Sequence, residues 1–228
     1  LGPNTVLNYE AEFIRIRTPL DRGIVQVNGN AGALPRDRYL GDPSRNNLHV
    51  NGDTHQFTLD HDLGQGWRTR VGASYRETDL YGEAVDLTGT LQADGRTLTR
   101  RDSWRSLPAR DTSVQAEVEG KLQTGGLRHT VLAGVESWRL FMGQDIRYST
   151  LASQPFAIDI HNPIYGQTPG NLTPGFDTRD RQRAMGLFVQ DQMDLSERWK
   201  LLAGVRFDRY HQDYENRLNR TVQTQSHS

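Results

Sequence analysis

One stretch decides the fold class, and it reads Trp67-Arg68-Thr69-Arg70-Val71-Gly72-Ala73-Ser74-Tyr75-Arg76. A β-strand points successive side chains to opposite faces, so one face carries Trp67, Val71 and Tyr75 while the other carries all three arginines. Three arginines on one face are difficult to bury in a dry core, but they suit a water-filled interior. The stretch therefore predicts a strand with one apolar face and one wet face.

Other parts of the chain alternate in the same way and stop at turn residues, which predicts a run of long antiparallel strands. The segment 128–142 has apolar residues at both parities, so its inward face stays undecided. Together with 67–78, the expected strands cover residues 5–17, 54–63, 112–122, 128–142, 183–195 and 199–210.

The connections between these strands alternate between long and short. Short turns are expected at 64–66, 123–126 and 196–198, and long connections at 18–51, 79–110 and 143–181. The second long connection contains Ala93-Asp94-Gly95-Arg96, which favours a short hairpin. Outer-membrane barrels show this asymmetry, with short periplasmic turns and long extracellular loops. Loops above ~15 residues are often functional, so we expect a binding surface at the long-loop end.

Composition separates this chain from other classes of protein. Mean hydropathy is −0.72 and hydrophobic residues make up 35%, yet the chain holds 4 Trp, 8 Tyr and 7 Phe, which disorder would not explain. The net charge of −1 gives no support to nucleic-acid binding. With no cysteine, the chain can form neither a disulfide framework nor a thiolate zinc site.

Several stretches of the chain together carry a resemblance to a known family. Two of them form the first long connection, Arg17-Thr18-Pro19-Leu20-Asp21-Arg22-Gly23 followed by Leu34-Pro35-Arg36-Asp37-Arg38-Tyr39-Leu40-Gly41-Asp42-Pro43, and a third is the strand His129-Thr130-Val131-Leu132-Ala133-Gly134-Val135-Glu136. The most specific is Gly186-Leu187-Phe188-Val189-Gln190-Asp191-Gln192-Met193 followed by Trp199-Lys200-Leu201-Leu202-Ala203-Gly204-Val205-Arg206-Phe207-Asp208. In this order they resemble TonB-dependent siderophore receptors of the ferric hydroxamate (ferrichrome) type, and the resemblance covers essentially the whole chain.

The resemblance implies a fold and a function. The fold is all-β, an antiparallel meander of about seven long strands that forms part of a 22-stranded transmembrane β-barrel around an N-terminal plug. The implied function is uptake of a ferric siderophore across the Gram-negative outer membrane. The partners would be the siderophore, TonB (through an N-terminal region) and outer-membrane lipid, and the complete barrel would be monomeric. Residues 1–228 are expected to be a partial barrel domain, without the plug and the C-terminal strands.

No enzyme chemistry, cofactor or metal site emerges from the residues. Glu117 and Glu119 share a strand face, as a glycosidase pair might, but charges that line a wet interior explain them better. His61 lies between two aspartates that point to the opposite face. His129 and His161 lack metal-ligand spacing.

The aromatic residues allow two interpretations. Trp67 and Trp199 follow short turns directly, where a periplasmic aromatic girdle belongs. Others lie in or beside the long connections, where rings and arginines could hold a chelate, although they could instead pack the loops or form the outer girdle. These candidate ligand-binding residues are Trp104, Trp138, Phe141, Tyr148 and Tyr165.

Two other functions remain open from the sequence alone. A general porin or an assembly barrel would share the strands but would bind no iron chelate. A soluble β-rich module, such as a sandwich, would have shorter strands and a dry inner face.

Overall fold

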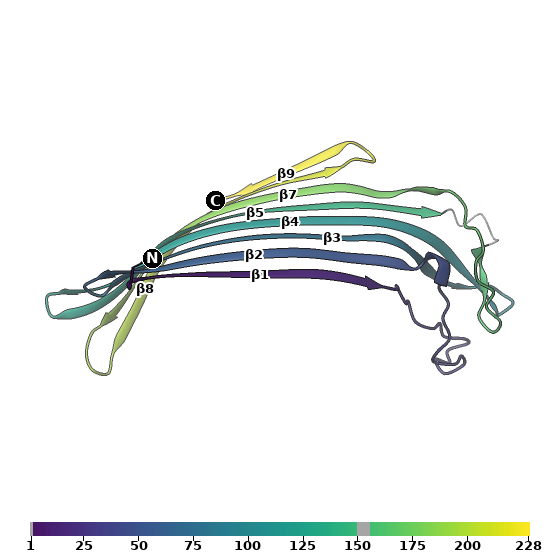
Figure 1. The fold of residues 1–228 in the computed structure, drawn as a ribbon, viewed down its shortest axis with the longest axis horizontal. Helices are drawn as coiled ribbons and strands as arrows, with labels where there is room; N and C mark the ends of the chain where they lie inside the picture. The colour runs from purple at the N-terminus through teal and green to yellow at the C-terminus, as the bar shows by residue number, and fades with distance from the viewer. Residues whose placement is uncertain (1, 150–155) are drawn as a thin grey trace.

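Long antiparallel strands form a single curved sheet in the computed structural model, which describes residues 2–149 and 156–228 (Figure 1). The strands lie side by side in the order β1-β2-β3-β4-β5-β7-β8-β9, and the short β6 pairs with β4. A 3-10 turn, Pro43–Arg45, precedes the second strand. The strands are β1 Thr5–Thr18, β2 Asn47–Gly64, β3 Trp67–Leu91, β4 Thr97–Thr124, β5 Leu127–Ser149, β6 Ile158–Asp159, β7 Leu172–Asp194, β8 Lys200–Asn216 and β9 Thr221–His227.

The predicted meander of about seven long strands is confirmed, and so are its three short turns, while two of the three expected long connections remain long, between β1 and β2 and between β5 and β7. Figure 1 shows the short β2–β3, β4–β5 and β7–β8 turns at one end of the sheet and the long connections at the other. Gln65 and Gly66 have positive φ, as do Gly125 and Gly126. Two such residues in succession give the tight hairpin turns that match the twist of the flanking strands.

Strand register places the apolar side chains of seven strands on one face. Leu7 lies opposite Leu59, and the same row continues across the sheet to Phe207. This register also assigns the two faces of β5. Val135 pairs with Ala116 and Leu187 and lies on the apolar side, so residues at the other parity, such as Trp138, lie on the polar side. The full row is Leu7, Leu59, Val71, Ala116, Val135, Leu187 and Phe207.

The expected long connection at 79–110 is wrong in extent. Here β3 and β4 continue as a paired hairpin, and the turn occupies only 92–96, around the predicted Asp94-Gly95. Alternation is lost because loops cover both faces at this end of the sheet. Ala84, Val85 and Asp86 are all buried although they are consecutive.

The other segment boundaries also shift towards longer strands. Of the expected connection 143–181, the parts 143–149 and 172–181 belong to β5 and β7, and residues 150–155 lie outside the described residues. The tail after His211, which shows no clear pattern in the sequence, completes β8 and forms β9. Its polar side chains do not prevent strand formation, because the backbone ladder to β8 supplies the pairing.

An apolar cluster lies at the long-connection end, away from the membrane-width part of the sheet. Leu34 and Leu40 of the β1–β2 connection pack with Leu98 of β4, with Ile158 of β6 and with Ile160 just after it. The cluster joins three segments that are far apart in the sequence, so the long connections form one assembly rather than separate loops.

Among the described residues, no helix has the length and apolar character needed to cross a membrane.

The sheet order of the described strands is an open path that ends at β1 and β9, so both edges lack a partner strand. Unpaired backbone groups are too costly in hydrocarbon for an open sheet to span a bilayer. We therefore expect the 228-residue chain, expressed alone, to form no functional pore. Planar-bilayer recording should detect no conductance of a single defined size, and such a conductance would contradict the open sheet.

Candidate ligand-facing surface

The face opposite the apolar rows is polar and crossed by ion pairs. Arg68 lies 2.8 Å from Glu119 and Arg70 lies 2.7 Å from Asp60, so two arginines of the deciding stretch have partners on neighbouring strands. On β8, Arg206 pairs with Glu136 and Asp208. Glu119 is thus held in an ion pair on this wet face, in agreement with the expectation that these charges line the interior.

Trp138 lies on this polar face, in the row of Ala184 and Tyr210. Its ring centroid is 6.2 Å from that of Tyr210, whose ring in turn stacks 6.4 Å from His227. Three strands thus present a row of rings to the wet side. Such rings can cover the apolar surface of a ligand.

Tyr148 also lies on the polar face, further towards the long connections. The guanidinium of Arg101 lies 3.7 Å from the centre of its ring, and Phe176 meets the ring edge-on at 6.4 Å. A cation over an aromatic ring adds attraction while its outer edge can still bind an anion.

The remaining three candidate residues lie elsewhere. Trp104 contacts Arg147, and Phe141 lies 6.0 Å from Arg181; both of these pairs are on the apolar side of the pleat. Tyr165 donates a hydrogen bond of 2.7 Å to the carbonyl of Tyr39 and so ties two connections together. The structure therefore does not gather the five aromatic residues around one point.

Arg100 is the centre of the assembly formed by the long connections. Its side chain is buried, with 2% exposure. It donates to the carbonyls of Leu40 (3.1 Å), Gly41 (2.6 Å) and Phe156 (3.0 Å), and to Gln167 Oε1 (2.9 Å). Buried charges need such partners, and four acceptors from two connections satisfy this one.

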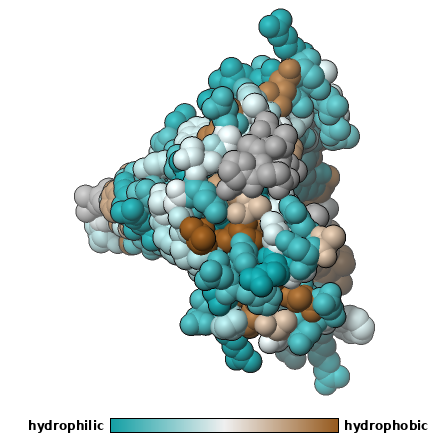
Figure 2. All heavy atoms as spheres, turned by 90° about the vertical axis from the view of Figure 1, so that its right-hand side faces the viewer, coloured by the Kyte–Doolittle hydropathy of each residue, from teal (hydrophilic) through white to brown (hydrophobic). Residues whose placement is uncertain are grey.

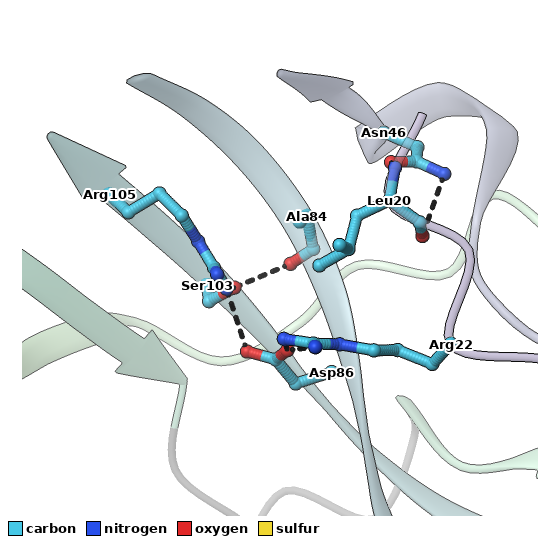
Figure 3. Close-up of polar contacts among 7 residues, drawn as sticks. All are labelled: Leu20, Arg22, Asn46, Ala84, Asp86, Ser103 and Arg105. Atoms are coloured by element: carbon cyan, nitrogen blue, oxygen red, sulfur yellow. Dashed lines mark hydrogen bonds and ion pairs between the residues drawn. The ribbon is translucent and has the colours of Figure 1, made fainter. Parts of the chain in front are cut away.

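A second polar junction holds the β1–β2 connection against the β3–β4 hairpin. Arg22 and Arg105 converge on Asp86, at 2.6 Å and 3.0 Å (Figure 3). Ser103 lies beside them, where it donates to the carbonyl of Ala84 and accepts from Arg105. The connection is thus fixed over the outer end of the sheet.

Two buried aspartates of the assembly differ in their pKa. Burial by itself raises the pKa of Asp42, but hydrogen bonds from Ser44 and Gly166 outweigh burial and hold it below its usual value. For Asp102, burial dominates over the opposing effect of Arg45 and raises the pKa to about 6. One oxygen of Asp102, Oδ1, has no hydrogen-bond partner.

Sequence reasoning did not single out Arg100, Asp86 or Asp102. Each lies in the hairpin that lacks visible alternation, and the contacts come from connections more than 40 residues away or from across the hairpin. The one sequence feature that points to this junction is weak: three charged residues follow one another in Thr99-Arg100-Arg101-Asp102. Among the described residues, no cluster of His, Cys, Asp and Glu could hold a metal ion.

Replacing Arg100 with Ala should loosen the assembly. A hydrogen bond to a charged group contributes roughly 1.5–3 kcal/mol, and several are lost together, so local stability should fall by about 3 kcal/mol or more. Limited proteolysis of the complete receptor should show faster cleavage in 34–41 and 156–167. Arg96→Ala, which removes an exposed pair with Asp159, is the control and should change cleavage little. Equal cleavage in both variants would contradict the central role of Arg100.

Replacing Asp102 with Asn should stabilise the hairpin at pH 7–8 and have no effect near pH 4. An unfolded Asp ionises near pH 4, whereas Asp102 ionises at about 6 in the folded state. The folded hairpin is therefore disfavoured as pH rises from 4 through 6, because the buried charge must form. Hydrogen exchange over 97–105, corrected for intrinsic rates, checks this. Reduced protection in D102N at pH 7–8 would show that the Arg45 pair outweighs the burial.

Seen from the long-connection end, the molecule is mostly hydrophilic with small apolar areas between polar ones (Figure 2).

Solved structures share this fold. The FpvAI–pyocin S2 complex has a TM-score of 0.80 and 16% identity, and the match covers 100% of this chain and 31% of that chain. The Escherichia coli K12 ferric-catecholate import receptor Fiu has a TM-score of 0.77 and 18% identity, and the match covers 95% of this chain and 33% of that chain. At these identities the likeness concerns the fold alone.

Curated proteins match at the level of sequence. The metal-pseudopaline receptor CntO of Pseudomonas aeruginosa UCBPP-PA14 is 40% identical over 96% of this chain, and the ferrioxamine B receptor of Salmonella typhimurium SL1344 is 25% identical over 84%. The chain spans 31% and 26% of their respective lengths. The family model described as TonB dependent receptor-like, beta-barrel matches residues 1–228. The chain therefore belongs to the TonB-dependent receptor-like β-barrel family.

Proposed function

We propose that the complete protein is a Gram-negative outer-membrane receptor that takes up a metal–chelator complex and draws energy through TonB. This chain supplies barrel wall and outer connections. The observation that carries the proposal is membership of the receptor family along residues 1–228, combined with one apolar and one wet face in consistent register. Iron or another metal is cargo in this function.

Among chelates, metal-pseudopaline is the first candidate. The two relatives near 40% identity are metal-pseudopaline receptors, whereas the ferrioxamine receptors and the ferrichrome transporter are about 25% identical. A ferric hydroxamate complex, which the sequence resemblance favoured, is the second candidate. Both are organic chelates with polar edges, which suits rings and arginines on a wet face.

Of the five candidate aromatic residues, we propose that Trp138 and Tyr148 contact the chelate. Both lie on the polar face, and each is flanked by another ring. Trp104 and Phe141 lie on the opposite parity, and Tyr165 is engaged with Tyr39, so a packing role suits these three better.

The two alternative functions, a soluble sandwich and a general porin, are separated by different observations. A soluble sandwich conflicts with the family assignment and with strands such as β4, which spans 28 residues. A general porin would share the barrel but show no saturable chelate binding. Binding by the complete receptor therefore separates the receptor from a porin.

Purified complete receptor should bind one of three chelates, metal-pseudopaline, ferrioxamine B or ferrichrome, saturably and without binding the metal-free chelators equally well. Trp138→Ala should weaken that binding by about tenfold, because stacking against a ring contributes roughly 1 kcal/mol or more. Quenching of intrinsic fluorescence or calorimetric titration gives the affinities.

The matched control is Phe141→Ala, three residues along the same strand but on the other face. It should leave the affinity unchanged. Absence of saturable binding for all three chelates would favour a porin, and equal losses in the two variants would remove Trp138 from the site.

A further inference from the structure

Beyond the chelate site, a group of arginines lies on the apolar side of the sheet, just past the apolar rows. Arg139 on β5 lies directly opposite Arg183 on β7, and Arg209 on β8 is one row closer to the apolar residues. All three side chains are exposed. None of them forms a hydrogen bond or an ion pair with any residue that the structure describes.

Like charges directly opposite on neighbouring strands repel, so this arrangement has an energetic cost unless an anion joins it. The acidic groups nearby are mostly engaged. Asp213 accepts from Thr224 and pairs with His211 at 3.1 Å, although its charge is also felt by Arg183. In the next row outward, Arg181 lies 4.0 Å from Glu215. A further arginine, Arg110, pairs with Glu77.

The arginines line two adjoining hollows on the surface. One, of about 580 Å³, is lined by four arginines and one carboxylate, with the ring of Phe141 at its side; the charged residues and the histidine are Arg110, Arg139, Arg181, Arg183, His211 and Asp213. The other, of about 380 Å³, shares Arg139 and Arg183 and adds Arg209 and Met185. The hollows thus combine several guanidinium groups with apolar walls.

The position of these arginines along the strands matches the outer boundary of a membrane. Ten residues separate His129, near the short-turn end of β5, from Arg139. At about 3.4 Å per residue and a tilt of about 40°, this rise corresponds to roughly 26 Å, close to the ~25 Å apolar band of outer-membrane barrels. Arg139 and Arg183 therefore lie where the hydrocarbon ends, on the long-connection side.

We propose that this surface, formed by Arg139, Arg183 and Arg209 with the walls of the two hollows, binds the phosphorylated headgroup of an outer-leaflet lipid. Guanidinium groups recognise phosphate through paired charge-assisted hydrogen bonds. The apolar rows immediately below, including Met185 and Leu187, lie beside the acyl chains of the same lipid. A phosphate there would relieve the repulsion between Arg139 and Arg183.

The test uses the complete receptor in detergent and three probes: lipid A carrying two phosphates, dephosphorylated lipid A, and inorganic phosphate. Native mass spectrometry measures bound lipid for the wild type, for Arg139→Gln/Arg183→Gln, and for the control Arg68→Gln/Arg76→Gln. The control removes two arginines from the polar face of β3. Gln keeps a polar, hydrogen-bonding group on these exposed side chains while removing their charge.

Wild-type receptor and control should bind the phosphorylated lipid alike, and the R139Q/R183Q variant should bind it about tenfold more weakly. Dephosphorylated lipid should bind weakly to all forms. Unchanged binding in R139Q/R183Q, or equal binding of the two lipids, would overturn the proposal. So would displacement of the lipid by equimolar inorganic phosphate, because the site would then serve a free anion.

The inference rests on the outer-membrane placement in the proposed function, but the two can fail separately. Chelate binding by the R139Q/R183Q variant should equal that of the wild type, since both residues lie on the face opposite Trp138. A receptor that binds chelate normally but shows no phosphate-dependent lipid binding would refute the inference alone.

Discussion

The hydrogen-bonded register between neighbouring strands is the constraint on which the rest of the structure depends. Once Val71 pairs with Ala116 and Ala116 with Val135, every side chain in those strands is assigned to one face or the other. The register runs without a shift across β4, β5, β7 and β8 through the apolar rows. Because the side-chain period is two, this ladder alone separates the apolar surface from the polar one.

At the long-connection end a different interaction takes over, since both faces of the β3–β4 hairpin are covered. There the chain is held by buried polar groups, with Arg100 joined to backbone carbonyls of two connections and Asp86 joined to two arginines. A buried charge is tolerated only when its partners are complete, so these junctions fix the connections in one arrangement. The rigid strands below and the assembly above thus have separate sources of order.

The sequence was sufficient to predict strands and their faces where one face of the sheet meets water and the other does not. The stretch from Trp67 to Arg76 could be assigned because its alternation agrees with the turn glycines before it. The face of Trp138 could not, because both parities of 128–142 hold apolar residues, and only the strand register assigns it. The sequence was insufficient at 79–110, where consecutive residues such as Ala84 and Val85 are both buried and hydropathy no longer alternates. It could not find Arg100 as a junction, because its acceptors are mostly backbone carbonyls, which any residue type could supply.

Adjacent residues of one strand can therefore serve unrelated partners. Trp138 and Arg139 are covalent neighbours, yet the pleat places the ring among Ala184 and Tyr210 on the wet face and the guanidinium beside Arg183 on the other. A slip of one residue in the β5–β7 register would exchange these faces, and with them the surfaces for chelate and for lipid. The same pairing that makes the wall thus also keeps the two binding surfaces apart, with only the thickness of one sheet between them.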